Sequence, residues 1–251
     1  MINLILSIAA GVLGFLLFYL TGIAHAAGSI VPGVIAAVAA FILLARRSGK
    51  QLEAVMAVAQ KEMAARKPER AVAVLQDAFK LASWQFGVSA SLHANIGVLL
   101  YVQKKFDEAE PHLAKSGATL LKLWQAQAML GAIHFRKKKW PEMEKVFDGA
   151  LRGNKKETLL YAVYAWCENQ RGEKKKAIEI LQNGVTENPS DEKLKTLLGR
   201  AQNDKRLKLD GFGEMWWQFW LETPPMMAGP QGGGGFAFTG RQRFGRGGYR
   251  R

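Results

Sequence analysis

The residue types that most often carry enzyme or metal chemistry are few and scattered in this chain. There is one cysteine, Cys167, so no internal disulfide can form. The histidines show no His-x-x-x-His or similar metal-ligand spacing; they are His25, His93, His112 and His134. Cys167 has no histidine or aspartate at a recognisable companion position, so we interpret it as a structural thiol. The sequence therefore predicts no metal site, no cofactor and no catalytic residue.

Two further patterns resemble catalytic or phosphate-binding motifs only superficially. The run from Gly232 to Gly235 is followed by no Gly-Lys-Ser/Thr and lies in a low-complexity segment, so it is not a phosphate loop. The neighbouring carboxylates Asp107 and Glu108, and Asp191 and Glu192, stand where helices are predicted to begin, and negative charge there favours the helix dipole. We therefore do not expect an enzyme, and the remaining candidates are binding surfaces.

The elements that must position any binding surface follow from a repeat in the middle of the chain. Small residues recur every 34 positions (131−97, 165−131 and 199−165), at Gly97, Gly131, Ala165 and Gly199. A second register follows twelve residues later, and each of its members precedes a bulky apolar residue by four positions: Ala109 with Leu113, Met143 with Phe147, and Ala177 with Leu181. A period of this length is typical of stacked helical pairs.

The repeated residues resemble the tetratricopeptide repeat (TPR) family. The family's Leu-Gly-x-x-Tyr pattern is approached by Ile96-Gly97-x-x-Leu100, Leu130-Gly131-x-x-His134 and Leu198-Gly199, and Pro189 stands where a repeat should end. The resemblance implies a right-handed helical solenoid of about four units with a capping helix. The helices that we expect cover residues 50–65, 68–83, 89–103, 106–117, 120–137, 140–152, 156–171, 174–187 and, as the cap, 191–207.

The N-terminal part of the chain predicts a membrane anchor. Residues 1–45 contain no Asp, Glu, Lys or Arg and hold two apolar runs, Ile2 to Tyr19 and Ile30 to Ala45. Each run approaches the length of a spanning helix, so a transmembrane hairpin is expected. Arg46, Arg47 and Lys50 follow the second run at once, which predicts that the repeats and the tail are cytoplasmic, at a plasma or inner membrane.

A cleaved signal peptide is the competing interpretation of the first run. The triplet Ala24-His25-Ala26 has the small-x-small form of a cleavage site, although no Lys or Arg precedes the first run. The second run would anchor the repeats in either case. We therefore expect an all-α chain in four parts: a transmembrane hairpin (1–47), TPR-like repeats (48–209), an aromatic segment (210–223) and a Gly/Arg-rich tail (224–251) that is predicted to be disordered.

Basic residues cluster in every predicted turn between the two helices of a repeat. Stacked repeats should align these turns along one edge, where the cations could face an anionic leaflet or an acidic partner. The alternative is that they are ordinary solvated turn residues. The set comprises Arg66, Lys67, Lys104, Lys105, Arg136, Lys137, Lys138, Lys139, Arg171, Lys174, Lys175 and Lys176.

The family resemblance also implies a groove lined by the first helix of each repeat. Its lining is small and apolar with one aromatic residue in each unit, which favours an apolar or amphipathic helix, or an extended segment with bulky side chains, as the guest. The alternative is that the aromatic residues are simply core. The candidate binding residues are Val98, Tyr101, Ala128, Phe135, Leu159, Trp166 and Asn169.

The segment from Phe212 to Leu221 is too rich in aromatic residues to be left in water. Three places for it stay open: over the last helix as a lid, in the groove of its own or a neighbouring molecule, or in the membrane interface.

The function that we expect is an anchored scaffold or adaptor that recruits other proteins at the cytoplasmic face. The alternative is a nucleic-acid or anionic-polymer binder, because the chain has a net charge of +14 and the tail interleaves Arg and Gly with Phe and Tyr. No cofactor is expected. Integral membrane association, contact with anionic lipid and a protein partner follow from the first interpretation, and the oligomeric state stays open.

Overall fold

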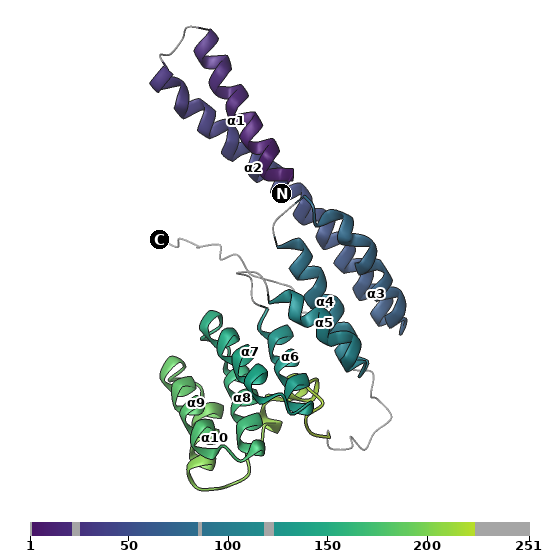
Figure 1. Cartoon of the computed structure of the whole chain (residues 1–251), viewed down its shortest axis with the longest axis vertical. Helices are drawn as coiled ribbons and strands as arrows, with labels where there is room; N and C mark the ends of the chain where they lie inside the picture. The colour runs from purple at the N-terminus through teal and green to yellow at the C-terminus, as the bar shows by residue number, and fades with distance from the viewer. Residues whose placement is uncertain (1, 22–25, 85–86, 118–122, 224–251) are drawn as a thin grey trace, which may run out of the picture.

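The computed structural model describes residues 2–21, 26–84, 87–117 and 123–223. All regular structure in these residues is helical, which confirms the all-α class, and the helices form an elongated array (Figure 1). The elements are α1 (Ile2–Leu20), α2 (Ala26–Ala64), α3 (Pro68–Asp77), η1 (Ala78–Leu81), α4 (Val88–Val102), α5 (Phe106–Ser116), α6 (Trp124–Arg136), α7 (Trp140–Gly153), α8 (Thr158–Arg171), α9 (Lys174–Glu187), α10 (Glu192–Gln202), η2 (Asp210–Phe212) and α11 (Glu214–Trp217).

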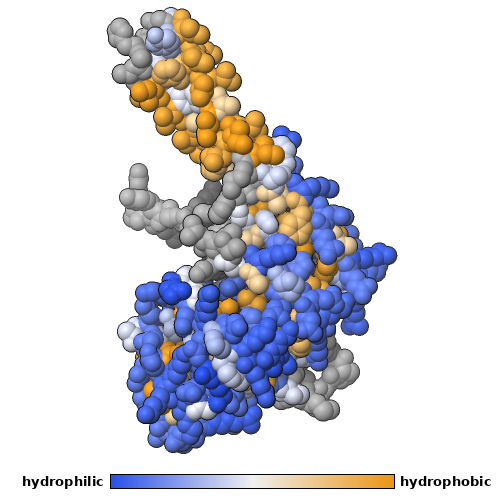
Figure 2. Space-filling view, viewed as in Figure 1, coloured by the Kyte–Doolittle hydropathy of each residue, from blue (hydrophilic) through white to orange (hydrophobic). Residues whose placement is uncertain are grey.

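The first helix and the first half of the second form a hairpin with an apolar outer surface (Figure 2). Glycines allow the two backbones to approach closely, because a Cβ added at Gly11 would lie 2.9 Å from Cβ of Ala37 and one added at Gly14 would lie 2.9 Å from Cβ of Ala36. By length and composition, α1 and α2 are each able to cross a membrane. The two expected apolar helices are therefore present.

Helix α2 continues without a break into the helical repeats, so the boundary expected at residue 47 lies inside one helix. The N-terminus of α1 lies at this same end of the hairpin and is attached as well. The amide nitrogens of Ile2 and Asn3 donate to the carbonyl oxygens of Ser83 and Trp84, each at 3.0 Å. The Asn3 carboxamide donates to the Ser48 hydroxyl at 2.8 Å. These bonds satisfy the first free N–H groups of α1 and fix the hairpin against the turn after η1.

Three helical pairs follow, α4 with α5, α6 with α7, and α8 with α9, and α4, α6 and α8 are neighbours (Figure 1). The 34-residue glycine register lies at the contacts within these pairs. A Cβ at Gly97 would lie 2.6 Å from a Leu113 methyl group, and one at Gly131 would overlap the ring of Phe147. The first helices are buried on most of their faces, whereas the second helices bury one stripe.

The turns inside the pairs share one backbone feature. Arg66, Lys104 and Lys138 have positive φ angles of 57°, 62° and 56°, and Gly172 takes the same place after α8 with φ 101°. A left-handed residue at this point is a common way to end a helix, and nearby cations favour the carbonyl end of the helix dipole. Part of the basic character of these turns therefore has a structural origin.

The last repeat helix is shorter than expected. Helix α10 begins after Asp191, whose carboxylate accepts from the Leu194 amide at 2.9 Å, and it ends at Gln202 rather than near residue 207. Residues 205–209 continue without regular structure and bury Leu207 and Leu209. The chain thus turns back along the repeats after α10 and leads into η2 and α11.

The close approach at Gly131 yields a paired prediction. Gly131→Ala should lower the free energy of unfolding by about 1–2 kcal/mol, because the added methyl group must displace the fully buried ring of Phe147, which stacks on Tyr164 at 4.7 Å. The measurement is a denaturant titration of the purified full chain, followed by circular dichroism.

Gly199→Ala is the matched control, since Gly199 occupies the same register but a Cβ there meets no atom within 4 Å. That substitution should stabilise the chain by roughly 0.5–1 kcal/mol through helix propensity alone. Equal effects of the two substitutions would contradict the packing described for the repeats.

Candidate protein-binding surface

The residues predicted to line a groove come together on α4, α6 and α8, and four of the seven are buried. Tyr101 and Trp166 are only 0% and 5% exposed, and Ala128 and Leu159 are buried as well. Val98, Phe135 and Asn169 are half-buried. We call this set the first-helix surface. Tyr101 and Trp166 are inaccessible because another part of the same chain covers them.

The cover is the aromatic segment near the C-terminus. Residues 210–222, called the docked segment below, bury Trp216 and Phe219 to 1% and 0% exposure. Trp216 meets Trp166 edge to face with ring centroids 5.4 Å apart. The Tyr101 hydroxyl donates to the Phe219 carbonyl oxygen at 2.5 Å. Of the three placements left open by the sequence, the segment adopts docking on the first helices of its own molecule.

Cations surround the docked segment. The Arg136 guanidinium donates to the carbonyl oxygen of Trp220, and the Lys104 ammonium lies 4.1 Å from the centre of the Trp220 ring. Arg206 pairs with Glu222 at 2.7 Å. Lys104 and Arg136 belong to the predicted basic turns, so two of these cations contact an aromatic ring or a peptide carbonyl while they remain exposed.

The hydroxyl of Tyr101 stays protonated and can therefore always donate a hydrogen bond. Burial raises the pKa of Tyr101 far above its ordinary value, with Arg136 opposing the shift, so the phenol stays protonated throughout the physiological range. A buried phenol needs a hydrogen-bond partner, and the Phe219 carbonyl supplies it. Sequence reasoning singled out Tyr101 but had no signal for this partner, which lies 118 residues further along the chain.

Phe135 has a packing role in addition to its place on the surface. Its ring lies 5.8 Å from that of Trp140 and 5.7 Å from that of Trp166, so it joins two neighbouring repeats. Phe135 is therefore partly a core residue, because it packs between repeats, and partly a surface residue, because it is only half-buried.

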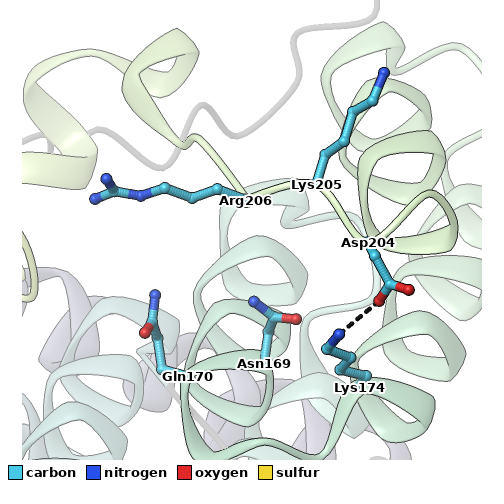
Figure 3. A pocket seen from close by; sticks show the side chains of 6 residues that line it. All are labelled: Asn169, Gln170, Lys174, Asp204, Lys205 and Arg206. Carbon is cyan, nitrogen blue, oxygen red and sulfur yellow. Dashed lines mark hydrogen bonds and ion pairs between the residues drawn. The ribbon is translucent and has the colours of Figure 1, made fainter.

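One end of the first-helix surface stays open as a polar pocket of about 430 Å³ (Figure 3). Asn169 and Gln170 lie on its α8 side, and Arg206 extends across from the opposite segment (Figure 3). Lys174 closes a corner by pairing with Asp204 at 2.6 Å. This pocket is bordered by amide and cationic groups and adjoins the chain that leads into the docked segment.

Many cations of the basic turns are paired with carboxylates, which the sequence did not predict. Six of the twelve cations form ion pairs: Lys105 with Glu69, Lys137 with Asp107 and Glu110, Lys139 with Glu110, Arg171 with Glu144 and Glu168, Lys174 with Asp204, and Lys176 with Glu144 and Glu168. Most of these carboxylates come from the second helix of the preceding repeat, so they are distant in sequence. The hydrogen bond from Lys137 lowers the pKa of Glu110, and that from Lys176 lowers the pKa of Glu144.

The other six turn cations differ in surroundings. Lys104 and Arg136 contact the docked segment, whereas Arg66, Lys67, Lys138 and Lys175 have no ion pair with the described residues. Six of the twelve turn cations thus lack a carboxylate partner in the described part of the chain, and two of these six contact the docked segment.

No group of three or more metal-ligating side chains occurs among the described residues. His93 and His112 face each other with their Nδ1 atoms 3.1 Å apart, and burial lowers the pKa of both. Cys167 is buried, and burial raises the pKa of its thiol well above the ordinary value, which disfavours the reactive thiolate. His134 is buried in the repeat packing, and His25 lies outside the described residues.

Comparison with known proteins adds no assignment. No family model and no curated protein matches this chain. The TPR resemblance therefore rests on the residues of the repeat alone and stays a prediction.

Proposed function

We propose that this protein is a membrane-anchored adaptor, in which TPR-like repeats forming a right-handed solenoid bind a segment of another protein at the cytoplasmic face. The hairpin of α1 and α2 is the anchor, and α4, α6 and α8 provide the binding surface. The proposal needs no cofactor and no catalytic group.

The observation that carries the proposal is the docked segment itself. The first-helix surface, together with Arg136 at the end of α6, holds a stretch of polypeptide through two kinds of contact. Tyr101 and Arg136 donate to backbone carbonyl oxygens, and Trp166 makes an aromatic contact. Backbone contacts supply affinity that is independent of sequence, and aromatic contacts select bulky side chains. These are the properties required of a peptide-binding surface.

The nucleic-acid alternative receives less support. Its main element, the Arg-rich tail with Arg241, Arg243, Arg246, Arg250 and Arg251, lies outside the described residues. Half of the turn cations are paired with carboxylates, which weakens their attraction for phosphate.

The cytoplasmic orientation can be tested by thiol labelling in intact cells. A membrane-impermeant maleimide should modify a cysteine at Thr21→Cys, in the link between the two apolar helices, and should leave one at Gln202→Cys unmodified. Both positions are exposed in the fold, and the native Cys167 is buried and gives little background. Modification of Gln202→Cys alone would contradict the orientation.

The adaptor function can be tested by site-specific photo-cross-linking in native membrane vesicles. A photoreactive residue in place of Asn169, at the open end of the first-helix surface, should form an adduct with a discrete protein. The same residue in place of Glu179, which is exposed on the second helix α9, should not.

The adduct should fall at least about fivefold when synthetic peptide with the sequence of residues 210–222 is added at several times its dissociation constant. A peptide with alanine in place of Trp216 and Phe219 is the control and should leave the yield unchanged. Equal yields from positions 169 and 179, or indifference to both peptides, would refute the adaptor proposal.

A further inference from the structure

The docked segment buries its aromatic side chains well but leaves several of their polar groups without hydrogen bonds. Trp216 and Phe219 are almost fully buried, yet the indole Nε1–H groups of Trp216, Trp220 and Trp166 are all buried without a hydrogen-bond partner among the described residues. A buried donor that has given up water and found no acceptor opposes docking. The strongest hydrophobic contacts are therefore accompanied by unfavourable polar ones.

The backbone of the segment is strained at the same place. Trp220 has φ 52°, in the left-handed region that a bulky side chain rarely adopts. Gly213, just before α11, has φ 63°, a backbone conformation that glycine adopts without steric cost. The left-handed conformation at Trp220 opposes docking, as the unpaired indole donors do.

The charges of the docked segment and of the groups around it indicate which kind of peptide the site binds. The docked segment contains Asp210, Glu214 and Glu222 and no Lys or Arg, which gives it a net charge of −3 in a chain whose total is +14. The groups around it are cations: Lys104, Arg136, Arg206, and Lys193 at 5.0 Å from the Phe212 ring centre. The surface is thus complementary to an acidic, aromatic stretch of polypeptide.

We propose that residues 210–222 are a displaceable intrachain ligand, and that the external partner is an acidic protein segment with two aromatic side chains three residues apart, as Trp216 and Phe219 are. The partner also supplies an acceptor to Nε1 of Trp166, the hydrogen bond that the intrachain segment fails to make. This inference rests on the proposed adaptor function and adds the chemistry of the partner and the competition that regulates it.

The intrachain segment competes with the external partner for the same site, so it weakens the apparent affinity of that partner. A tethered segment is present at an effective concentration on the order of millimolar. If its intrinsic dissociation constant is about 100 µM, the site is free about a tenth of the time, and an external ligand binds about tenfold more weakly than to a free site. Only a segment with better contacts displaces it.

The test measures binding of a fluorescently labelled peptide with the sequence of residues 210–222 to the full chain in nanodiscs, by anisotropy. The release variant carries Trp216→Ala and Phe219→Ala, which removes the docking side chains but leaves the first-helix surface intact. It should bind the peptide at least about tenfold more tightly than the natural sequence does. Met215→Ala is the matched control in the same segment, because Met215 is exposed, and it should bind as the natural sequence does.

A second arm avoids any folding defect of the release variant. A recognition site for a specific protease, inserted between Leu209 and Asp210, lets the chain fold with its segment in place and then be cut. After cutting and dilution the segment should dissociate, and the protein should bind the labelled peptide as the release variant does. A cut segment that stays bound after extended dilution would overturn displaceability.

The remaining outcomes separate the two proposals. Equal affinity of the natural sequence and the release variant would overturn the competition while leaving a peptide-binding surface in place. Failure of a helical, intact release variant to bind the peptide would overturn the acidic aromatic partner, and cross-linking at position 169 would still decide the adaptor function.

A peptide in which Asp210, Glu214 and Glu222 are replaced by their amides should bind several-fold more weakly. Formation of dimers through exchanged segments would assign the site to a second copy and overturn an external partner.

Discussion

The need to cover the exposed side of the first helices governs the arrangement of the repeats and of the C-terminal segment. Helices α4, α6 and α8 contact second helices on one side and one another on the flanks, and Tyr101 and Trp166 lie on the side that residues 210–222 cover. Large aromatic groups in contact with water are costly, and Tyr101 also needs a hydrogen-bond partner. Residues 210–222 meet both requirements through Trp216 and the Phe219 carbonyl. Their docking also explains why the chain reverses after Gln202 instead of extending α10.

The apolar hairpin and the repeats are structurally continuous. Helix α2 carries the apolar span and the first repeat helix in one element, and the amides of Ile2 and Asn3 bond to the turn at Ser83 and Trp84. Two separate links, one covalent and one by hydrogen bonds, therefore join the repeats to the hairpin. In the proposed function, the anchor therefore orients the binding surface as well as tethering it.

Much of the helical order was predictable because it depends on local periodicity. The 34-residue register places Gly97 and Gly131 opposite Leu113 and Phe147, and contacts between neighbouring helices follow from such spacing. Two features were not predictable in the same way. The carboxylates that pair with the turn cations, such as Glu110 with Lys137, come from another repeat, and Phe219 meets Tyr101 across most of the repeat region. Contacts between residues far apart in sequence leave no periodic signal, so the sequence alone left three placements for the aromatic segment open.

The most direct test of the account is amide hydrogen exchange of residues 214–220 in the full chain, in nanodiscs, compared between the natural sequence and Tyr101→Phe. The Phe219 amide bonds to the Trp216 carbonyl oxygen within the docked segment, so it should exchange slowly in the natural sequence. Removing the Tyr101 hydroxyl leaves the buried Phe219 carbonyl unpaired, which costs about 1–1.5 kcal/mol and should speed exchange by roughly tenfold without changing α5 or α7. Exchange at the rate of an unstructured chain in the natural sequence, or no response to Tyr101→Phe, would contradict docking of the segment on the first helices.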